Sequence, residues 1–338
     1  MSERPKRATI KEIAERTGLS ASAVSYALRG QHVSAETEAR VREAADALGY
    51  RRDPIAQALR GGATGTIGLV VGTLADYWNL ELVAALQREL RATERHLLIA
   101  DAGGDATTET ELARSLVDRR VDGLIVVPLG PMGTGWGEIA AATPTVSIGD
   151  ELAIGGTAGA LVFDNDRAVE SMLRHLAGYG HQHISVLTFA QEGGEPDGAA
   201  ERAVPAWSDR LGLACDLVVS PLRGDGAQPL VRELLAGPGA PTAVLALSDS
   251  LAFETYAATR DLRLRVPEDV SVAGYADHPL SRLVSPPLTS IDWRSDEIAT
   301  AAVAALQRAL DGHEAAEAVK VEPQLRARAS TGPVPSRA

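Results

Sequence analysis

The first candidate for chemistry is a short stretch of small and polar side chains, Ala21, Ser22, Ser25 and Tyr26. A helix that reads DNA bases presents such side chains at its exposed first turn, because the backbone must approach the base edges closely. The residue types therefore suit hydrogen bonding and apolar contact in a DNA groove. They can act in this way only if flanking elements hold the helix at a surface.

The flanking sequence predicts a pair of short helices joined by a tight turn. Thr9 precedes Glu12 by three residues, which is the spacing of a capping box, and Gly18 can take the positive φ that ends a helix. Ser20 is a natural N-cap for the second helix. These signals predict a helix-turn-helix, and a third helix is expected from Ser34 until Gly49 stops it. A generic three-helix miniature domain is the alternative interpretation.

A further short helix is predicted between Pro54 and Gly61. A helix of this length is unstable alone in water. It is either a linker or a segment that folds only against a partner copy and the DNA minor groove. In the second case Leu59 serves as an apolar wedge and Arg60 lies beside phosphate or the groove edges.

The segment from Thr9 to Leu59 resembles the DNA-binding head and hinge of the LacI/GalR family of bacterial transcription regulators. The resemblance implies phosphate contacts for Thr9, Ser20 and Ser25, and base contacts for Ala21, Ser22 and Tyr26. It also places His32 near the groove and Leu59 at the central step of a palindromic operator. The expected DNA-binding residues are Thr9, Ser20, Ala21, Ser22, Ser25, Tyr26, His32, Ala56, Leu59 and Arg60. Tyr26 stands where many members have an arginine, and it offers one hydroxyl and a ring.

From Thr66 onward, short apolar runs alternate with longer helical patterns, and the rhythm restarts after residue 151. A single last strand is expected near residues 319–325. Strands separated by helices predict parallel sheets, and two successive units predict two lobes. The expected fold class is α/β, with an all-α helix-turn-helix head and a two-lobed body like that of periplasmic binding proteins. The expected domains are a head at 1–50, a hinge and linker at 51–63, and an effector-binding and dimerisation domain at 64–338.

The run "LRLRVPEDVSVAGYADHPLSRLVSPPLTSI" resembles the family's effector-binding core. Ligands of such folds lie at the carboxyl ends of the strands, between the lobes. The expected effector-binding residues are Asp76, Trp78, Asn79, Ser248, Asp249, Tyr275, Asp277 and Trp293.

The polar residues that sugar-binding members bring to hydroxyl groups are replaced in this chain. The places of an arginine, an asparagine and an aspartate match Ala203, Ser248 and Ala276, although Arg202 is an alternative match for the arginine. Losing these groups weakens a sugar site. The hypothesis is an effector other than an ordinary hexose, an aromatic or amphipathic molecule that stacks on Trp78 or Trp293. The alternative is that both tryptophans serve only in packing.

Charge is distributed unevenly along the chain. The net charge is -12, yet residues 1–60 contain 11 basic and 8 acidic residues. A basic head on an acidic body is compatible with DNA binding by the head. The single cysteine, Cys215, excludes an intrachain disulfide and is expected to be a small buried hydrophobe. No signal peptide or membrane span is recognisable in the sequence, so a soluble cytoplasmic protein is expected.

No catalytic or cofactor motif is recognisable in the sequence. It contains neither a G-x-S-x-G element nor a G-x-G-x-x-G element between a strand and a helix, and no triad can be assigned. His181 and His183 have a spacing that can bind metal but lack nearby ligands, so a turn surface is favoured. The prediction is a non-enzymatic homodimeric regulator, most simply a repressor, without a cofactor or membrane contact. Its partners are double-stranded DNA and a small-molecule effector. The rivals are a binding protein that has lost DNA regulation and a sugar-modifying enzyme.

Overall fold

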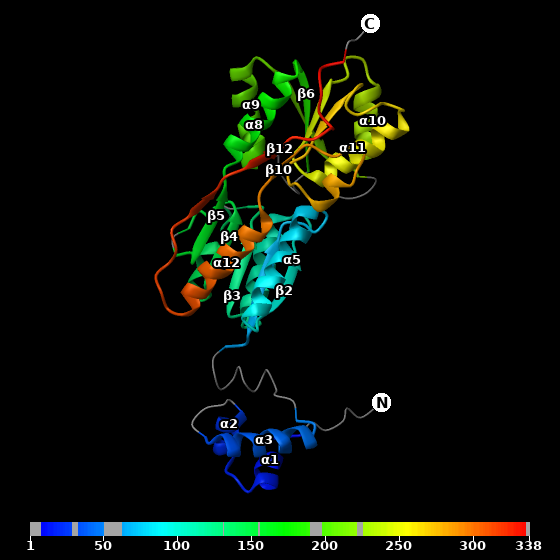
Figure 1. The fold of residues 1–338 in the computed structure, drawn as a ribbon. Coiled ribbons are helices and arrows are strands. Elements are labelled where there is room, and N and C mark those ends of the chain that lie inside the picture. Colours follow the sequence, from blue (N-terminus) through cyan, green and yellow to red (C-terminus); the bar gives the residue numbers. More distant parts are fainter. Residues whose placement is uncertain are drawn as a thin grey trace, which may run out of the picture. The chain divides into compact units, whose positions relative to one another are not determined.

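The computed structural model describes residues 8–28, 33–50, 63–130, 132–154, 156–189, 198–221 and 226–335. The chain divides into two compact units, Met1–Thr64 and Gly65–Ala338, here called the head and the body. Figure 1 shows helices in the head and two α/β lobes in the body. None of the helices in the described part of the chain combines the length and apolar composition of a membrane-spanning segment.

The head contains α1 (Ile10–Thr17), α2 (Ala21–Leu28) and α3 (Ala35–Ala47). The predicted capping box starts α1, because the amide of Thr9 donates to Glu12 Oε2 at 2.6 Å and the amide of Glu12 donates to Thr9 Oγ1. Gly18 ends α1 with a φ of 69°. The amide of Ala23 donates to Ser20 Oγ at 3.1 Å, which caps α2. The predicted helix-turn-helix is confirmed.

The three helices of the head enclose a small apolar core. Its centre is formed by side chains with no exposed surface, Ile13, Val24, Ala27 and Val41, with at least one from each helix. Because these residues recur at helical spacing, each short helix buries one stripe and leaves the opposite face free. The predicted hinge helix, with Ala56, Leu59 and Arg60, lies outside the described residues, as does His32.

The first lobe of the body is a six-stranded sheet in the order β11-β5-β4-β3-β1-β2, with every pair parallel. Side chains alternate across it, since Leu69 and Val71 join one buried cluster and Val70 joins another. Helices α5 and α12 cover one face, and α6 and α7 cover the other. The bounds are β1 (Thr66–Val71), α5 (Tyr77–Ala92), β2 (His96–Asp101), α6 (Ala106–Asp118), β3 (Gly123–Val127), α7 (Trp136–Ala142), β4 (Thr145–Gly149), β5 (Gly159–Phe163), α12 (Ser295–Leu310) and β11 (Val319–Val321).

The second lobe is a four-stranded parallel sheet in the order β7-β6-β8-β9. Ile184 and Val186 on β6 join one buried cluster, and Leu187 joins the other. The bounds are α8 (Asn165–Gly178), β6 (His183–Phe189), α9 (Ala199–Leu211), β7 (Ala214–Ser220), α10 (Gln228–Ala236), β8 (Ala243–Ala246), α11 (Asp249–Asp261), β9 (Ser271–Ala273) and a 3-10 turn η1 (Pro279–Arg282). The predicted two-lobed parallel-sheet body is confirmed.

The chain passes between the lobes near Phe163, near Trp293 and after Val321. Helix α12 therefore returns to the first lobe after the second lobe is complete (Figure 1). The single last strand expected near residues 319–325 is wrong. The structure has β11 in the first sheet and β12 (Gln324–Arg326) in an antiparallel pair with β10 (Ser290–Asp292). Pro323 stands between β11 and β12, and it has no amide hydrogen to donate to either ladder.

The prediction for His181 is also wrong. Its side chain is 1% exposed rather than on a turn surface. Its Nδ1 lies 2.9 Å from Thr242 Oγ1, and its Nε2 lies 3.0 Å from Ser271 Oγ and 3.1 Å from the Gly332 carbonyl oxygen. These contacts fasten the last described segment to the second lobe. The histidine is a structural residue, and burial lowers its pKa.

Candidate functional site

A pocket of about 190 Å³ lies between the two lobes, at the carboxyl ends of both sheets. It is smaller than the roughly 300–1,000 Å³ of a drug-sized ligand site. Its walls come from the loop before α5, the first turns of α8 and α9, and the segments that follow β5, β8, β9 and β10. The lining residues are Asp76, Trp78, Phe163, Asn165, Ala199, Ala200, Glu201, Leu247, Ser248, Tyr275, Ala276 and Trp293.

Four aromatic rings form much of the pocket wall. Phe163 stacks on Trp293 with 4.5 Å between the ring centroids and an interplanar angle of 11°. Trp78 meets Phe163 edge to face at 5.2 Å, and the ring centroids of Tyr275 and Trp293 are 5.6 Å apart. Hydrogen bonds fix two of these rings, since Trp293 Nε1 donates to the Tyr275 carbonyl oxygen and Tyr275 Oη donates to Asn165 Oδ1. These contacts hold the rings of the wall against one another.

Two hydrogen bonds cross from one lobe to the other beside the pocket. Ser248 Oγ, at the start of α11, donates to Asp76 Oδ1 at 2.9 Å. The amide of Tyr77 donates to Ser250 Oγ at 2.9 Å. Asp76 also accepts from the amide of Trp78, which caps α5. Burial raises the pKa of Asp76 above its ordinary value, although these hydrogen bonds act in the opposite direction.

Five of the eight predicted effector residues line the pocket, and three do not. Those that line it are Asp76, Trp78, Ser248, Tyr275 and Trp293. Asn79 is buried one position along α5, where its Nδ2 donates to the Thr73 carbonyl oxygen. The expected position of Asn79 in the pocket is corrected, because the next residue on a helix points to a different side.

Asp249 holds the loops of the second lobe together instead of lining the pocket. Its Oδ1 accepts from the amides of Tyr275 and Ala276 and from Ser290 Oγ. Its Oδ2 accepts from the amide of His278 and from Ser281 Oγ. Asp249 is 1% exposed, and these five donors occupy both oxygens. It therefore positions the pocket wall, which is a different role from the expected one.

Asp277 likewise lies outside the pocket lining. Its Oδ1 is 2.5 Å from Arg328 Nη1, and its Oδ2 is 3.4 Å from Arg282 Nη2. Its backbone has a φ of 47°, and its amide donates to Ser290 Oγ. The carboxylate of Asp277 is thus paired with two arginines, Arg282 and Arg328.

Several lining residues were not predicted from the sequence. Phe163 and Asn165 come from the end of β5 and the start of α8, and Glu201 comes from the first turn of α9. Of the three replaced sugar-site positions, Ser248 and Ala276 line the pocket. Ala203 is buried in α9 outside it.

On the head, the predicted contact residues occupy the start and exposed side of α2. Ala21 and Ser22 are exposed, Ser25 is half-buried, and Tyr26 is 43% exposed. Ser20 and Thr9 are exposed caps of α2 and α1. The buried side of α2 is formed by Val24 and Ala27. The helix therefore presents small and polar groups outward, as the docking of a helix in a DNA groove requires.

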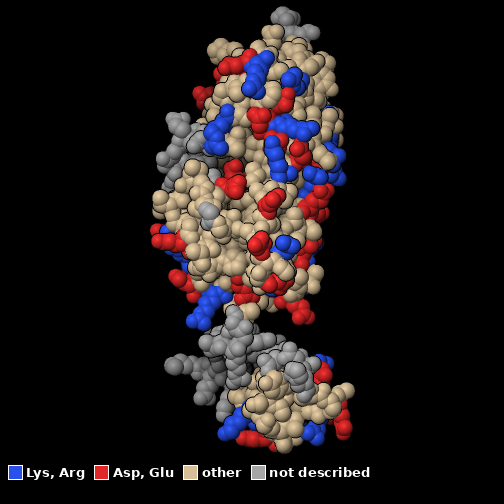
Figure 2. Space-filling model, turned by 90° about the vertical axis from the view of Figure 1, so that its left-hand side faces the viewer, with Lys and Arg blue, Asp and Glu red and all other residues tan. Residues whose placement is uncertain are grey.

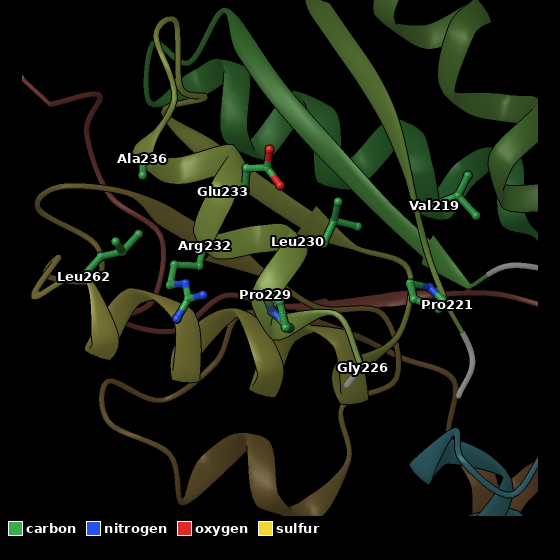
Figure 3. Close-up of a pocket in the computed structure, with 9 residues that line it drawn as sticks. All are labelled: Val219, Pro221, Gly226, Pro229, Leu230, Arg232, Glu233, Ala236 and Leu262. Carbon is green, nitrogen blue, oxygen red and sulfur yellow. The ribbon is translucent and has the colours of Figure 1, made fainter. Parts of the chain in front are cut away.

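A second pocket, of about 790 Å³, lies on the second lobe alone (Figure 3). Val219 and Pro221 line it beside α10, which contributes Pro229, Leu230 and Arg232. It is open, and its described lining residues include no aromatic residue and none from the first lobe. A ligand there cannot bridge the two lobes, so the pocket between them is the better candidate for an effector.

The described residues offer little support for metal binding or for thiol chemistry. No group of three or more His, Cys, Asp and Glu side chains with metal-binding geometry occurs among the described residues. Cys215 is partly buried, and burial raises its pKa to about 11. A thiol with that pKa is a poor nucleophile at neutral pH. Figure 2 shows basic and acidic side chains interspersed over the visible face of the body.

The fold and the site together define a class of protein: a DNA-binding head joined to a two-lobed, effector-binding body. Comparison with known families supports each part. Residues 9–53 match the bacterial regulatory proteins of the lacI family, and residues 173–331 match the periplasmic binding protein-like domain. Both matches, together with the fold, identify the chain as a DNA-binding transcriptional regulator of the LacI type.

Individual relatives agree over nearly the full chain. The ribose operon repressor of Haemophilus influenzae is 28% identical, over 94% of this chain and 96% of that protein. The HTH-type transcriptional repressor PurR of Aliivibrio fischeri is 27% identical, over 96% of this chain and 98% of that protein. The lac repressor dimer bound to operator and the anti-inducer ONPF has the same fold, with a TM-score of 0.80 and 22% identity over 97% of this chain and 100% of that chain.

Proposed function

We propose that the protein is a homodimeric repressor that binds a palindromic operator and is controlled by a small molecule held between the lobes of each body. Two heads then occupy adjacent major-groove half-sites, and the paired hinge segments contact the minor groove between them. The observation that best supports the proposal is the pairing of a polar, exposed α2 surface with a pocket whose walls come from both lobes.

The head supports specific DNA contact through its side chains. Ala21 and Ser22 are small enough to let the α2 backbone approach the base edges. Tyr26 offers its hydroxyl as a hydrogen-bonding group and its ring as an apolar surface for a thymine methyl group. Ser20 Oγ accepts from an amide, and its own hydrogen can still be donated to a phosphate.

The body supports control by an effector because the same residues line the pocket and join the lobes. Asp76 and Ser248 both face the pocket, and they are hydrogen-bonded to each other across it. A ligand that contacts either group changes the free energy of lobe closure. Such coupling between sites is typically worth about 1–3 kcal/mol.

The lining favours an effector other than an ordinary hexose. A sugar needs several hydrogen-bonding partners for its hydroxyl groups, and much of this wall consists of aromatic rings and alanines. Ser248 and Ala276 stand at positions where sugar-binding members place polar side chains, and Ser248 Oγ already donates to Asp76.

The test is a DNA shift assay with the promoter region of the protein's own gene. We expect wild type to shift this duplex specifically, and we expect Tyr26→Ala and Leu59→Ala each to lose at least tenfold in affinity for it. Ala39→Ser, on the exposed surface of α3, is the matched control in the head and should bind like wild type. Equal and weak binding of every duplex by all four proteins would favour a ligand-binding protein that has lost DNA regulation.

A further inference from the structure

We propose that the effector is a small organic cation, an amine or quaternary ammonium compound, held among the aromatic rings and carboxylates between the lobes. This inference rests on the proposed function, since it specifies the chemical class of ligand for the same pocket.

The charge of the pocket wall points to a cation. Asp76 and Glu201 are the carboxylic acids among the described lining residues, which include no lysine, arginine or histidine. Among the ion pairs of the described residues, none involves either carboxylate. A cation bound between the lobes would offset the negative charge of these two carboxylates.

The starts of helices α5, α8, α9 and α11 also line this pocket, and a helix N-terminus without a capping side chain favours anions. Three of the four are already satisfied by side chains. Asp76 accepts from the amide of Trp78 at the start of α5, Asp164 accepts from the amide of Arg167 in α8, and Ser248 accepts from the amide of Ser250 in α11. Two of these caps are themselves carboxylates, Asp76 and Asp164, and Asp164 is also paired with Lys320 Nζ at 2.8 Å.

The aromatic wall has the composition of a cation-binding cage. Trp78, Phe163, Tyr275 and Trp293 come from both lobes and from the crossing segments between them. Such rings attract an ammonium group to their negative faces, and the attraction grows when water is excluded. Because the rings contact one another and two are held by hydrogen bonds, little ordering is needed on binding.

The raised pKa of Asp76 is consistent with a cation-binding pocket. Burial raises the pKa of its carboxyl group, and the nearby charge of Asp249 adds to that rise. The hydrogen bonds from Trp78 and Ser248 and the neighbouring His278 oppose it. A carboxylate that burial makes costly to ionise is stabilised by a cation beside it.

The experiment is isothermal titration of the full-length protein with a fixed panel of probes. Choline is compared with its neutral isostere 3,3-dimethyl-1-butanol, and tetramethylammonium, cyclohexylammonium, ribose and glucose complete the panel. We expect choline or another cation to bind, and 3,3-dimethyl-1-butanol to bind at least tenfold more weakly than choline. Equal affinity for choline and its isostere would overturn the inference. Failure of all three cations to bind at concentrations up to about 10 mM would also overturn it. A dissociation constant above that limit corresponds to less than about 3 kcal/mol of binding free energy.

Charge-removing variants localise the binding. Asp76→Asn and Glu201→Gln keep the shape of the side chain and should each weaken the affinity for the best-binding cation at least tenfold. Glu111→Gln removes an exposed carboxylate elsewhere on the first lobe and should leave that affinity unchanged. Thermal unfolding checks that each variant is folded. Unchanged affinity in both pocket variants would contradict the assignment even if a cation binds.

The outcomes separate this inference from the proposed function. Tight binding of ribose or glucose without binding of any cation would overturn the cation assignment and leave an effector-controlled repressor intact. Loss of specific DNA binding in the shift assay would instead overturn the repressor, whatever ligand the pocket accepts.

Discussion

Ser248 Oγ donates a hydrogen bond to Asp76 Oδ1 at 2.9 Å, although the two residues are 172 positions apart and belong to different lobes. Each residue also caps a helix, Asp76 at α5 and Ser248 at α11. The bond therefore ties the first turns of two helices together at the edge of the pocket. A ligand in the pocket meets the same two polar groups, so ligand binding and lobe closure share their contacts.

A double-mutant cycle tests the bond between the lobes. We expect Asp76→Ala and Ser248→Ala to be non-additive, with a coupling free energy of about 0.5–2 kcal/mol in urea unfolding, because each removes the same hydrogen bond. Asp105 caps α6 in the same way and has no contact with Ser248. The cycle of Asp105→Ala with Ser248→Ala should be additive within about 0.5 kcal/mol. Equal coupling in both cycles would refute a direct bond.

Asp249 is expected to be the most sensitive polar residue of the second lobe. Asp249→Ala removes the acceptor of five hydrogen bonds, so we expect the free energy of unfolding to fall by about 3 kcal/mol or more. Asp261→Ala, at the exposed end of the same helix, should cost less than about 1 kcal/mol. Urea unfolding measures both. Similar small losses in the two variants would show that the Asp249 bonds contribute little.

The buried carboxyl group of Glu109 should make the free energy of unfolding depend on pH. Its side chain has no exposed surface, and burial raises its pKa from 4.5 to about 7, although it accepts from the amides of Leu129 and Gly130. A raised pKa means that the fold favours the protonated acid. The contribution of Glu109 to stability is therefore complete below pH 4.5 and falls as the pH rises toward about 7.

The measurement is urea unfolding of wild type and Glu109→Gln at pH 5 and pH 8. We expect wild type to lose roughly 2–3 kcal/mol more than the variant between these values, since one unit of pKa corresponds to about 1.4 kcal/mol. Glu111→Gln, an exposed carboxylate on the same helix, should retain the wild-type dependence. The same pH dependence in wild type and Glu109→Gln would contradict the assignment.

Because the head and the body are separate compact units, a core change in the head should unfold only the head. Ile13 has no exposed surface and lies in the small core shared by α1, α2 and α3. Ile13→Ala should cost about 2–5 kcal/mol, a large part of the stability of so small a unit. We expect circular dichroism to show loss of the head helices, together with loss of DNA binding and a nearly unchanged main unfolding transition of the body. A single shifted transition for the whole chain would contradict independent units.

The sequence predicted the parts of the fold that have strong local signals. Thr9, Gly18 and Ser20 defined the head helices because capping and positive φ depend on neighbouring residues only. The buried parallel strands were recognisable as short apolar runs such as residues 66–71 and 183–189. The small strand β5 and the helix α9 were missed. Helix α9 contains Pro205 in its interior, which argues against a helix in a sequence pattern.

Part of the candidate site was also predicted from local sequence signals, because some of its residues lie near the ends of recognisable strands. Asp76, Ser248 and Tyr275 lie two to five positions after the last residue of a strand, and ligands of such folds lie at strand ends. Phe163 and Glu201 belong to the two elements that were missed, so their place in the pocket was not foreseen. Asp249 was assigned to the ligand because of its position, whereas its buried surroundings hold five donors that only the tertiary fold brings together.

The central claim is that occupancy of the pocket between the lobes changes the DNA affinity of the head. Ala199 is half-buried and lines the pocket at the first turn of α9, whereas Ala206 is exposed on the same helix. Fluorescence anisotropy with an operator duplex from the protein's own promoter region compares Ala199→Trp, which fills the pocket, with Ala206→Trp. We expect Ala199→Trp to change operator affinity at least fivefold, since a coupling of about 1–3 kcal/mol corresponds to roughly 5–150-fold, and Ala206→Trp to bind like wild type. Wild-type affinity in both folded variants would contradict the claim.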